Sequence, residues 1–495
     1  MTSRDRPGNQ IILVGALSTA GGFGIRFGAR FLFLVVAGQL FGAALFGAYS
    51  VAVALLETCV ALSSLSLKKS LFQILDENDT IEIPAIFCVM DAVLLVTGAG
   101  IVLSVLVMAA TLFLPSPFAT SDTRIAIFWI APMIASQALA DILFAATRWK
   151  HAVRYEVIGR SIIEPYALVG GAVLAFFFGA PTSGLIIGYW TANIALNIYA
   201  ITAVRRSFGP FRIADYRLDR RLIGAVWRLL PNTGTDLVNA LFLRVDIFLV
   251  GFLLGERLAG IYGMAQQIRT PVRQVRQSFD SMLVPLVART LARKGITATI
   301  GALGTAARLI LSIQMPLFLV IIGFGAAILG LFGRDFSHGY SALILLTAAE
   351  AIQGSSGVGD LLFVYRSPKT GFWTMLAGFC SAAAIGAIAT PLFGIAGAAA
   401  GMLAASFFQA VLRHHIIHSR FHAGDVGFAL SQPCLAGLAG LVMMSVVQWG
   451  VAPANATVPV LCGLLAYAGS LLLILRSSGQ TLALKGFTTS EASLA

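Results

Sequence analysis

The stretch that decides the fold runs from Leu243 to Arg289 and reads LRVDIFLVGFLLGERLAGIYGMAQQIRTPVRQVRQSFDSMLVPLVAR. Its second half repeats polar side chains at successive spacings of 4, 3, 4, 3 and 4 residues, which places them on one face of a helix. These side chains are Tyr262, Gln266, Arg269, Arg273, Arg276 and Asp280. Apolar and small residues fill much of the remainder. The stretch therefore predicts a helix with a charged stripe, and the meaning of that stripe depends on the rest of the chain.

The composition is that of a membrane protein. The chain has 495 residues, of which 58% are hydrophobic and only 11% are charged, and its mean hydropathy is +0.87. Soluble domains carry about 25% charged residues, so we predict an all-α polytopic membrane protein. Apolar runs of about 20 residues predict about fourteen transmembrane helices. They include runs near 229–254, 259–288, 303–332, 370–390 and 394–416, with a basic loop near 289–302 and a short external loop near 391–394. The first run follows Arg4 and Arg6 with no small-residue cleavage site, so we expect it to serve as the membrane signal itself.

Basic residues gather in alternate loops between the apolar runs. The positive-inside rule then predicts a multi-pass protein of the bacterial cytoplasmic (inner) membrane with both termini in the cytoplasm. We attribute the net charge of +12 to this topology and to attraction by anionic membrane lipids rather than to nucleic-acid binding. The predicted external loops are all short. They leave no room for the large catalytic loop that membrane glycan polymerases usually carry, so we predict that the protein is not an enzyme.

An internal repeat is visible in the glycine pattern. Gly42-Ala-Ala-Leu-Phe-Gly47-Ala-Tyr49 matches Gly255-Glu-Arg-Leu-Ala-Gly260-Ile-Tyr262, and Gly184-Leu-Ile-Ile-Gly188 matches Gly397-Ala-Ala-Ala-Gly401. Both matches have a separation of 213 residues (42 to 255, and 184 to 397). We therefore predict two six-helix lobes in parallel repeat, with the substrate path between them. The predicted parts are a lobe at 1–203, a basic linker at 204–223, a second lobe at 224–420, two extra helices at 421–476 and a disordered tail at 477–495.

Two segments carry a family resemblance. The run Arg244-Val-Asp246-Ile-Phe-Leu-Val-Gly251, followed by Gly255 and Ala259-Gly-Ile-Tyr262, resembles the seventh and eighth helices of bacterial polysaccharide flippases. The segment from Leu40 to Ser50 is similar to the one after their first helix. This family belongs to the multidrug/oligosaccharidyl-lipid/polysaccharide exporter superfamily. The three arginines of the stripe depart from its usual eighth helix, which is mostly apolar or mildly polar.

The resemblance implies a transporter that flips a polyprenyl-pyrophosphate-linked oligosaccharide in exopolysaccharide biosynthesis by alternating access. The implied partners are the lipid-linked glycan, membrane lipids and glycan polymerase or assembly proteins, and we expect a monomer. Two alternatives come from the same superfamily, a multidrug extruder-type antiporter and a peptidoglycan lipid-precursor flippase. A membrane glycan polymerase or ligase and a scaffold protein of an envelope-assembly complex are further alternatives.

The arginine stripe is the leading candidate for substrate binding. An arginine in mid-bilayer costs about 3 kcal/mol or more, so it must face protein, water or ligand. Guanidinium groups offer planar, paired donors that suit a pyrophosphate, and Gln266 adds neutral hydrogen bonds for sugars. Pro271 interrupts the backbone ladder and predicts a bend. The competing interpretation is that carboxylates on neighbouring helices pair with the stripe, or that the segment lies in the membrane interface.

Other charged residues in the predicted spans complete the candidate site. The predicted substrate-binding set is Arg269, Arg273, Arg276, Gln266, Arg244, Arg26 and Arg30. The candidates for binding a coupling proton or Na⁺ are Asp236, Asp246 and Glu57, for each of which a structural salt bridge is the competing interpretation. Arg160 and Glu164 lie four residues apart and predict an intrahelical pair. We find no catalytic constellation and no P-loop, and we expect no cofactor. His414 and His418 have a metal-like spacing of four residues but lack the glutamate of a zinc protease, so we interpret them as a solvated cluster that flanks the membrane.

Overall fold

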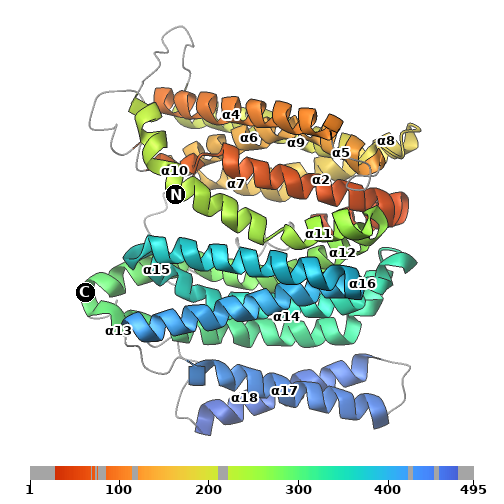
Figure 1. The fold of residues 1–495 in the computed structure, drawn as a ribbon, viewed down its shortest axis with the longest axis vertical. Coiled ribbons are helices and arrows are strands. Elements are labelled where there is room, and N and C mark those ends of the chain that lie inside the picture. Colours follow the sequence, from red (N-terminus) through yellow and green to blue (C-terminus); the bar gives the residue numbers. More distant parts are fainter. Residues whose placement is uncertain are drawn as a thin grey trace, which may run out of the picture. The chain divides into compact units, whose positions relative to one another are not determined.

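The computed structural model describes residues 28–68, 70–72, 75, 85–113, 121–209, 221–421, 427–450 and 456–477. Within these ranges the regular secondary structure is entirely helical (Figure 1). Among the described helices, 8 are long and apolar enough to cross a membrane, or up to 10 if each of two bent pairs forms one span. The all-α multi-pass prediction is therefore confirmed, whereas the count of fourteen stays a prediction. Arg26, most of the linker 204–223 and nearly all of the tail 477–495 lie outside the described residues.

The chain divides into two compact units. The first unit comprises Met1–Gly263 with Leu331–Asp335, and the second comprises Met264–Gly330 with Phe336–Ala495. This division by packing falls inside a helix, between Gly263 and Met264, rather than in the basic linker. The lobes proposed at 1–203 and 224–420 describe a sequence repeat and stay a prediction.

The first unit is built from helices that run alongside one another (Figure 1). They are η1 (Ala37–Phe41), α2 (Gly42–Ser63), α4 (Ala85–Phe113), α5 (Ser121–Ile130), α6 (Met133–Trp149), α7 (Val153–Ile158), η2 (Gly159–Ile163), α8 (Glu164–Phe177), α9 (Gly184–Phe208), α10 (Arg221–Phe242), α11 (Val245–Leu254) and α12 (Glu256–Ile268), whose last five residues belong to the second unit. The core cluster around Phe144 and Leu196 fixes α6 against α9. A bend of 48° divides the run predicted over 229–254 into Pro231–Phe242 and Val245–Leu254.

The second unit contains two very long helices that each bend at one glycine. Its elements are α13 (Thr270–Gly330), η4 (Arg334–Gly339, which begins in the first unit), α14 (Tyr340–Ser356), η5 (Gly357–Gly359), α15 (Asp360–Arg366), α16 (Pro368–Phe421), α17 (Gly427–Gly450) and α18 (Thr457–Ser477). Gly295 in α13 has φ 79° and Gly394 in α16 has φ 63°, a left-handed backbone that glycine adopts readily. Each of these helices therefore consists of two helical segments that meet at a glycine kink, within the loops that the sequence predicted near 289–302 and 391–394. The pair α17–α18 packs on α13 through Leu319, Ala436 and Tyr467.

Corresponding residues of the sequence repeat meet in the first unit, where α2 contacts α12. A Cβ atom added at Gly47 would overlap the carbonyl oxygen of Glu256 and lie 2.6 Å from Gly260 N. A Cβ atom added at Gly260 would overlap the carbonyl oxygen of Ala43 and lie 3.0 Å from Gly47 N. Residues 43 and 47 are the repeat counterparts of 256 and 260, so each helix presents the same surface to the other. Glycine at both positions is what allows the two backbones to approach so closely.

Candidate functional site

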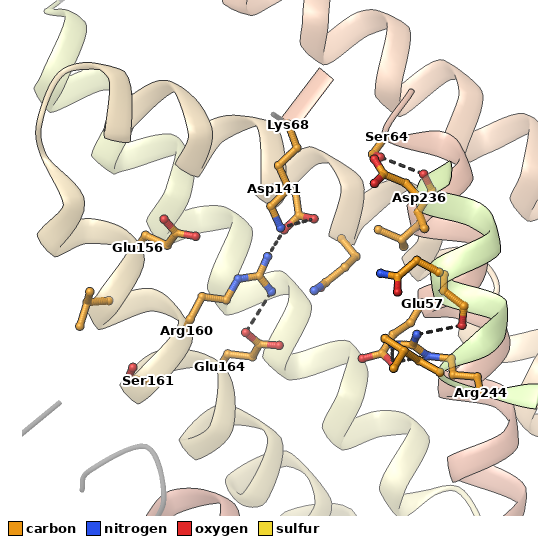
Figure 2. Close-up of a pocket in the computed structure, with 17 residues that line it drawn as sticks. Glu57, Ser64, Lys68, Asp141, Glu156, Arg160, Ser161, Glu164, Asp236 and Arg244 are labelled. Carbon is orange, nitrogen blue, oxygen red and sulfur yellow. Dashed lines mark hydrogen bonds and ion pairs between the residues drawn. The ribbon is translucent and has the colours of Figure 1, made fainter. Parts of the chain in front are cut away.

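A polar cavity of about 680 Å³ opens within the first unit (Figure 2). Three cationic side chains line it, namely Lys68, Arg160 and Arg244, and so do the amides of Gln137 and Asn239. Five carboxylates also line it, those of Glu57, Asp141, Glu156, Glu164 and Asp236. Charged groups are costly in an apolar environment, so a polar cavity of this kind among apolar helices is a candidate for a ligand or ion path.

Each cationic side chain of the cavity lies at or close to a break in regular helix. Arg160 belongs to the π-helix η2, and Arg244 precedes α11 at the bend with φ −133° and ψ −3°. Lys68 follows a turn in which Leu65 and Ser66 have φ values of 47° and 55°, which residues other than glycine seldom adopt. Irregular backbone at membrane depth is tolerated where it is buried in protein or lines a polar cavity. These breaks therefore direct the three cations toward the cavity, and each break costs local backbone energy.

The cationic groups all pair with carboxylates in this structure. The guanidinium group of Arg160 contacts Asp141 and lies 3.2 Å from Glu164, and Lys68 Nζ lies 3.1 Å from Asp141 on its other side. Across the cavity, Arg244 Nε donates to Glu57 Oε2 at 2.8 Å (Figure 2). The Glu57 side chain is 48% exposed and that of Arg244 is 22% exposed, so this pair is wet. The Arg160 cluster is drier and holds three helical segments together, whereas the Glu57–Arg244 pair can exchange partners with a ligand at low cost.

The structure brings three predicted site residues into the cavity, namely Glu57, Asp236 and Arg244. The Asp236 carboxylate accepts a hydrogen bond of 3.1 Å from the Ser66 hydroxyl group. Asp246, a fourth candidate, does not line the cavity. It is 1% exposed and accepts hydrogen bonds from the Tyr262 hydroxyl group at 2.8 Å and the Ile247 amide at 2.9 Å. These bonds give Asp246 a structural position between α11 and α12.

The arginine stripe lies in the second unit, where a carboxylate of α14 pairs with it. Arg273 Nε donates to Glu350 Oε2 at 3.1 Å, and Arg269 Nη1 lies 3.8 Å from the same oxygen. Arg269 is 3% exposed, and Gln266 is half-buried. The helix is interrupted at Arg269, where α12 ends at Ile268 and α13 begins at Thr270, as Pro271 predicted. The interpretation that neighbouring carboxylates pair with the stripe thus describes this conformation.

Arg276 occupies the carbonyl end of a broken helix. Its guanidinium group donates to the backbone oxygens of Gln353 at 3.2 Å and Gly357 at 2.9 Å, where α14 gives way to η5. These carbonyl groups carry the partial negative charge of a helix C-terminus. A Cβ atom at Gly357 would strike this guanidinium group, so glycine there makes room for it. Arg276 therefore stabilises the break in the helix, and its predicted role in substrate binding is untested. Arg30 is half-buried in the first described helix, outside the residues that line the cavity.

The sequence missed part of the cavity. The sequence assigns no site role to Lys68, Asp141 or Glu156, and it predicts the Arg160–Glu164 pair only as a contact within one helix, which the 3.2 Å separation confirms. The signal that could have found the cavity is the placement of ionisable residues inside apolar runs next to Gly159 and Ser66, where helices break.

Several solved structures of other proteins have a similar fold. No protein-family model matches the sequence, and no curated protein is detectably similar to it. A structure of the lipid II flippase MurJ in an inward closed conformation has a TM-score of 0.72 at 16% identity, over 93% of this chain and 99% of that chain. An inward-facing multidrug resistance MATE family transporter of the MOP superfamily has a TM-score of 0.65 at 12% identity, over 80% of this chain and 98% of that chain.

The MATE multidrug transporter DinF-BH is also similar, with a TM-score of 0.58 at 17% identity over 86% of this chain and 99% of that chain. The chain thus has the fold of these transporters. The fold that the resemblance implies is confirmed, and membership of the superfamily and of the polysaccharide flippase family stays a prediction. Such a fold supports many substrates, so the substrate must be argued from the site.

Proposed function

We propose that the protein is a flippase for a polyprenyl-pyrophosphate-linked glycan intermediate, working by alternating access. The observation that carries this proposal is the cavity in the first unit, where cations, amides and hydroxyl groups line a volume of about 680 Å³. That volume falls in the range of about 300–1,000 Å³ that small-molecule sites occupy. Cationic groups suit a diphosphate, and the amide groups of Gln137 and Asn239 suit sugar hydroxyl groups.

Arg244 is the cationic group of the cavity that is best placed to bind the diphosphate. Its carboxylate partner, Glu57, is half-exposed. An anionic ligand can therefore replace Glu57 at Arg244 without leaving the Glu57 carboxylate buried and unpaired. Arg160 is held by two carboxylates and is less available. The proposed substrate-binding set also keeps the predicted Arg269 and Arg273 of the second unit.

A flipping assay tests this proposal. Proteoliposomes would carry a polyprenyl diphosphate oligosaccharide labelled with a nitrobenzoxadiazole group on its sugar, and dithionite would quench the label in the outer leaflet. We expect Arg244→Ala to slow flipping at least about tenfold, the equivalent of losing one charged hydrogen bond. The matched control is Arg257→Ala, which breaks an exposed 3.0 Å pair with Asp335 outside the cavity. Equal flipping rates for Arg244→Ala and the unchanged protein would contradict the proposal.

A second candidate function is a multidrug antiporter for organic cations. The observation that favours it is the excess of carboxylates over cations in the cavity lining, five against three. Its signature is proton-driven efflux of a cationic dye from vesicles, lost in Glu57→Gln, together with no movement of the labelled lipid. The flippase proposal requires the opposite pair of results.

A further inference from the structure

The second unit contains a buried guanidinium group whose hydrogen-bonding needs are unmet. Arg269 is 3% exposed, and its Nε atom is buried with no hydrogen-bond partner among the described residues. Within the part of the chain that the structure describes, its ion pair is to Glu350 at 3.8 Å, which is longer than a hydrogen bond. A buried polar group left in this condition is rare and points to a function or to a missing partner.

The charges around Arg269 do not balance. Four arginines lie in this cluster, namely Arg269, Arg273, Arg276 and Arg413, and three carboxylates face them, namely Asp280, Glu350 and Asp360. Asp360 binds Arg413 through two hydrogen bonds of 2.7 Å and 2.8 Å, and Asp280 lies 3.8 Å from Arg276. Glu350 is thus shared by the two remaining arginines, so among the described residues this cluster has one more arginine than carboxylates.

The geometry at Glu350 is that of a carboxylate occupying the position of a larger anion. All of its close contacts to the two arginines use one oxygen, Oε2, with Arg273 at 3.1 Å and Arg269 at 3.8 Å. Arg269 and Arg273 lie four residues apart on one helical face, so both guanidinium groups can reach the same oxyanion. A phosphate group has three such oxygens and a second negative charge, and it can bind both guanidinium groups at hydrogen-bond length.

We propose that Glu350 is a displaceable internal counter-ion that occupies a phosphate seat formed by Arg269 and Arg273. In the state described, the carboxylate neutralises part of the arginine charge and keeps the seat closed. A ligand phosphate replaces it and supplies the hydrogen bonds that Arg269 lacks. Glu350 is thereby a positioning residue that lowers the affinity of the seat and allows release. This inference rests on the proposed function for the identity of the ligand, a lipid-linked diphosphate, but not for the existence of the seat.

Inorganic pyrophosphate is the probe that tests the seat, titrated into the full-length protein in detergent by isothermal calorimetry. Glu350→Gln keeps the side-chain volume and removes the competing charge, so we expect its Kd to be at least about tenfold lower than that of the unchanged protein. Glu350→Ala, which also opens space, is expected to gain as much or more. Adding Arg269→Ala to either variant is expected to abolish the gain. The matched control is Asp335→Ala, which frees an exposed arginine, Arg257, and is expected to leave the Kd unchanged.

Each result of the calorimetry either supports or overturns the proposed phosphate seat. An unchanged or weaker affinity in Glu350→Gln, with thermal unfolding like that of the unchanged protein, overturns the proposal. So does a gain that survives Arg269→Ala, because the anion would then bind elsewhere. A structural salt bridge alone predicts lower stability without tighter pyrophosphate binding. If the affinity rises as expected but the unchanged protein moves no labelled lipid in proteoliposomes, the seat stands and the proposed substrate is wrong.

Discussion

Replacing Gly47 with alanine tests the contact between the two copies of the repeat. The added Cβ would overlap the carbonyl oxygen of Glu256 and lie 2.6 Å from Gly260 N, and both are backbone atoms that cannot rotate away. The helices α2 and α12 must therefore separate. Overpacking of this kind costs about 1–3 kcal/mol. Alanine has a helix propensity up to about 1 kcal/mol more favourable than that of glycine, which offsets part of this cost. We therefore expect the free energy of unfolding to fall by up to about 2 kcal/mol.

Replacing Gly260 with alanine tests the same contact from the other helix. Gly260→Ala would meet the carbonyl oxygen of Ala43, the repeat counterpart of the atom that Gly47→Ala meets, so both variants should lose similar stability. The control is Gly98→Ala in α4, where a Cβ would meet nothing within 4 Å. It should be neutral or slightly stabilising. Thermal unfolding in one detergent, followed by far-UV circular dichroism, measures all three. The reasoning is refuted if Gly47→Ala is as stable as Gly98→Ala, or if only one of the paired glycines is sensitive.

Two further substitutions test the buried charges of the first unit. Tyr262→Phe removes the hydroxyl group that donates to Asp246, which is 1% exposed, and should cost about 2 kcal/mol in the same unfolding assay; no loss would mean that water replaces the hydroxyl group. Arg160→Ala leaves Asp141 and Glu164 without their shared cation and should cost about 3 kcal/mol or more, with little relief from added salt. A loss that salt abolishes would show that the cluster is far wetter than its burial indicates.

Much of the fold was predictable because apolar length and helix-breaking residues act locally. The turn predicted at 391–394 appears at Gly394, and the interruption predicted from Pro271 appears between Ile268 and Thr270. These features depend on one residue and its immediate backbone, which the sequence states directly. The number of spans does not follow from the same local signals, because several apolar runs join end to end into single long helices.

The candidate site was predictable only in part, because ion pairs depend on which helices are neighbours. The spacing of Arg269 and Arg273 placed both on one face, but their partner, Glu350, lies 77 residues beyond Arg273. The spacing of Arg160 and Glu164 predicted their contact. It did not predict that Arg160 also reaches Asp141, because this depends on a π-helix that changes the direction of the side chain.

Two aspartates that lie 219 residues apart (141 to 360), outside the 213-residue register of the repeat, have comparable surroundings in the two halves of the chain. Asp141 and Asp360 begin matching Asp-x-Leu-Phe segments, and each binds an arginine. In the first unit the Asp141 cluster lines a cavity, and Lys68, one of its cations, has a side chain that is 40% exposed. In the second unit the side chain of the partner, Arg413, is 3% exposed and also donates to Gln353. A network with its hydrogen bonds satisfied inside the protein rigidifies its surroundings, whereas a wet one can exchange partners. The Arg413–Asp360 pair therefore braces the second unit, whereas in the first unit the exposed Lys68 is the member of the Asp141 cluster that can exchange partners, and the buried Arg160 holds Asp141 in place.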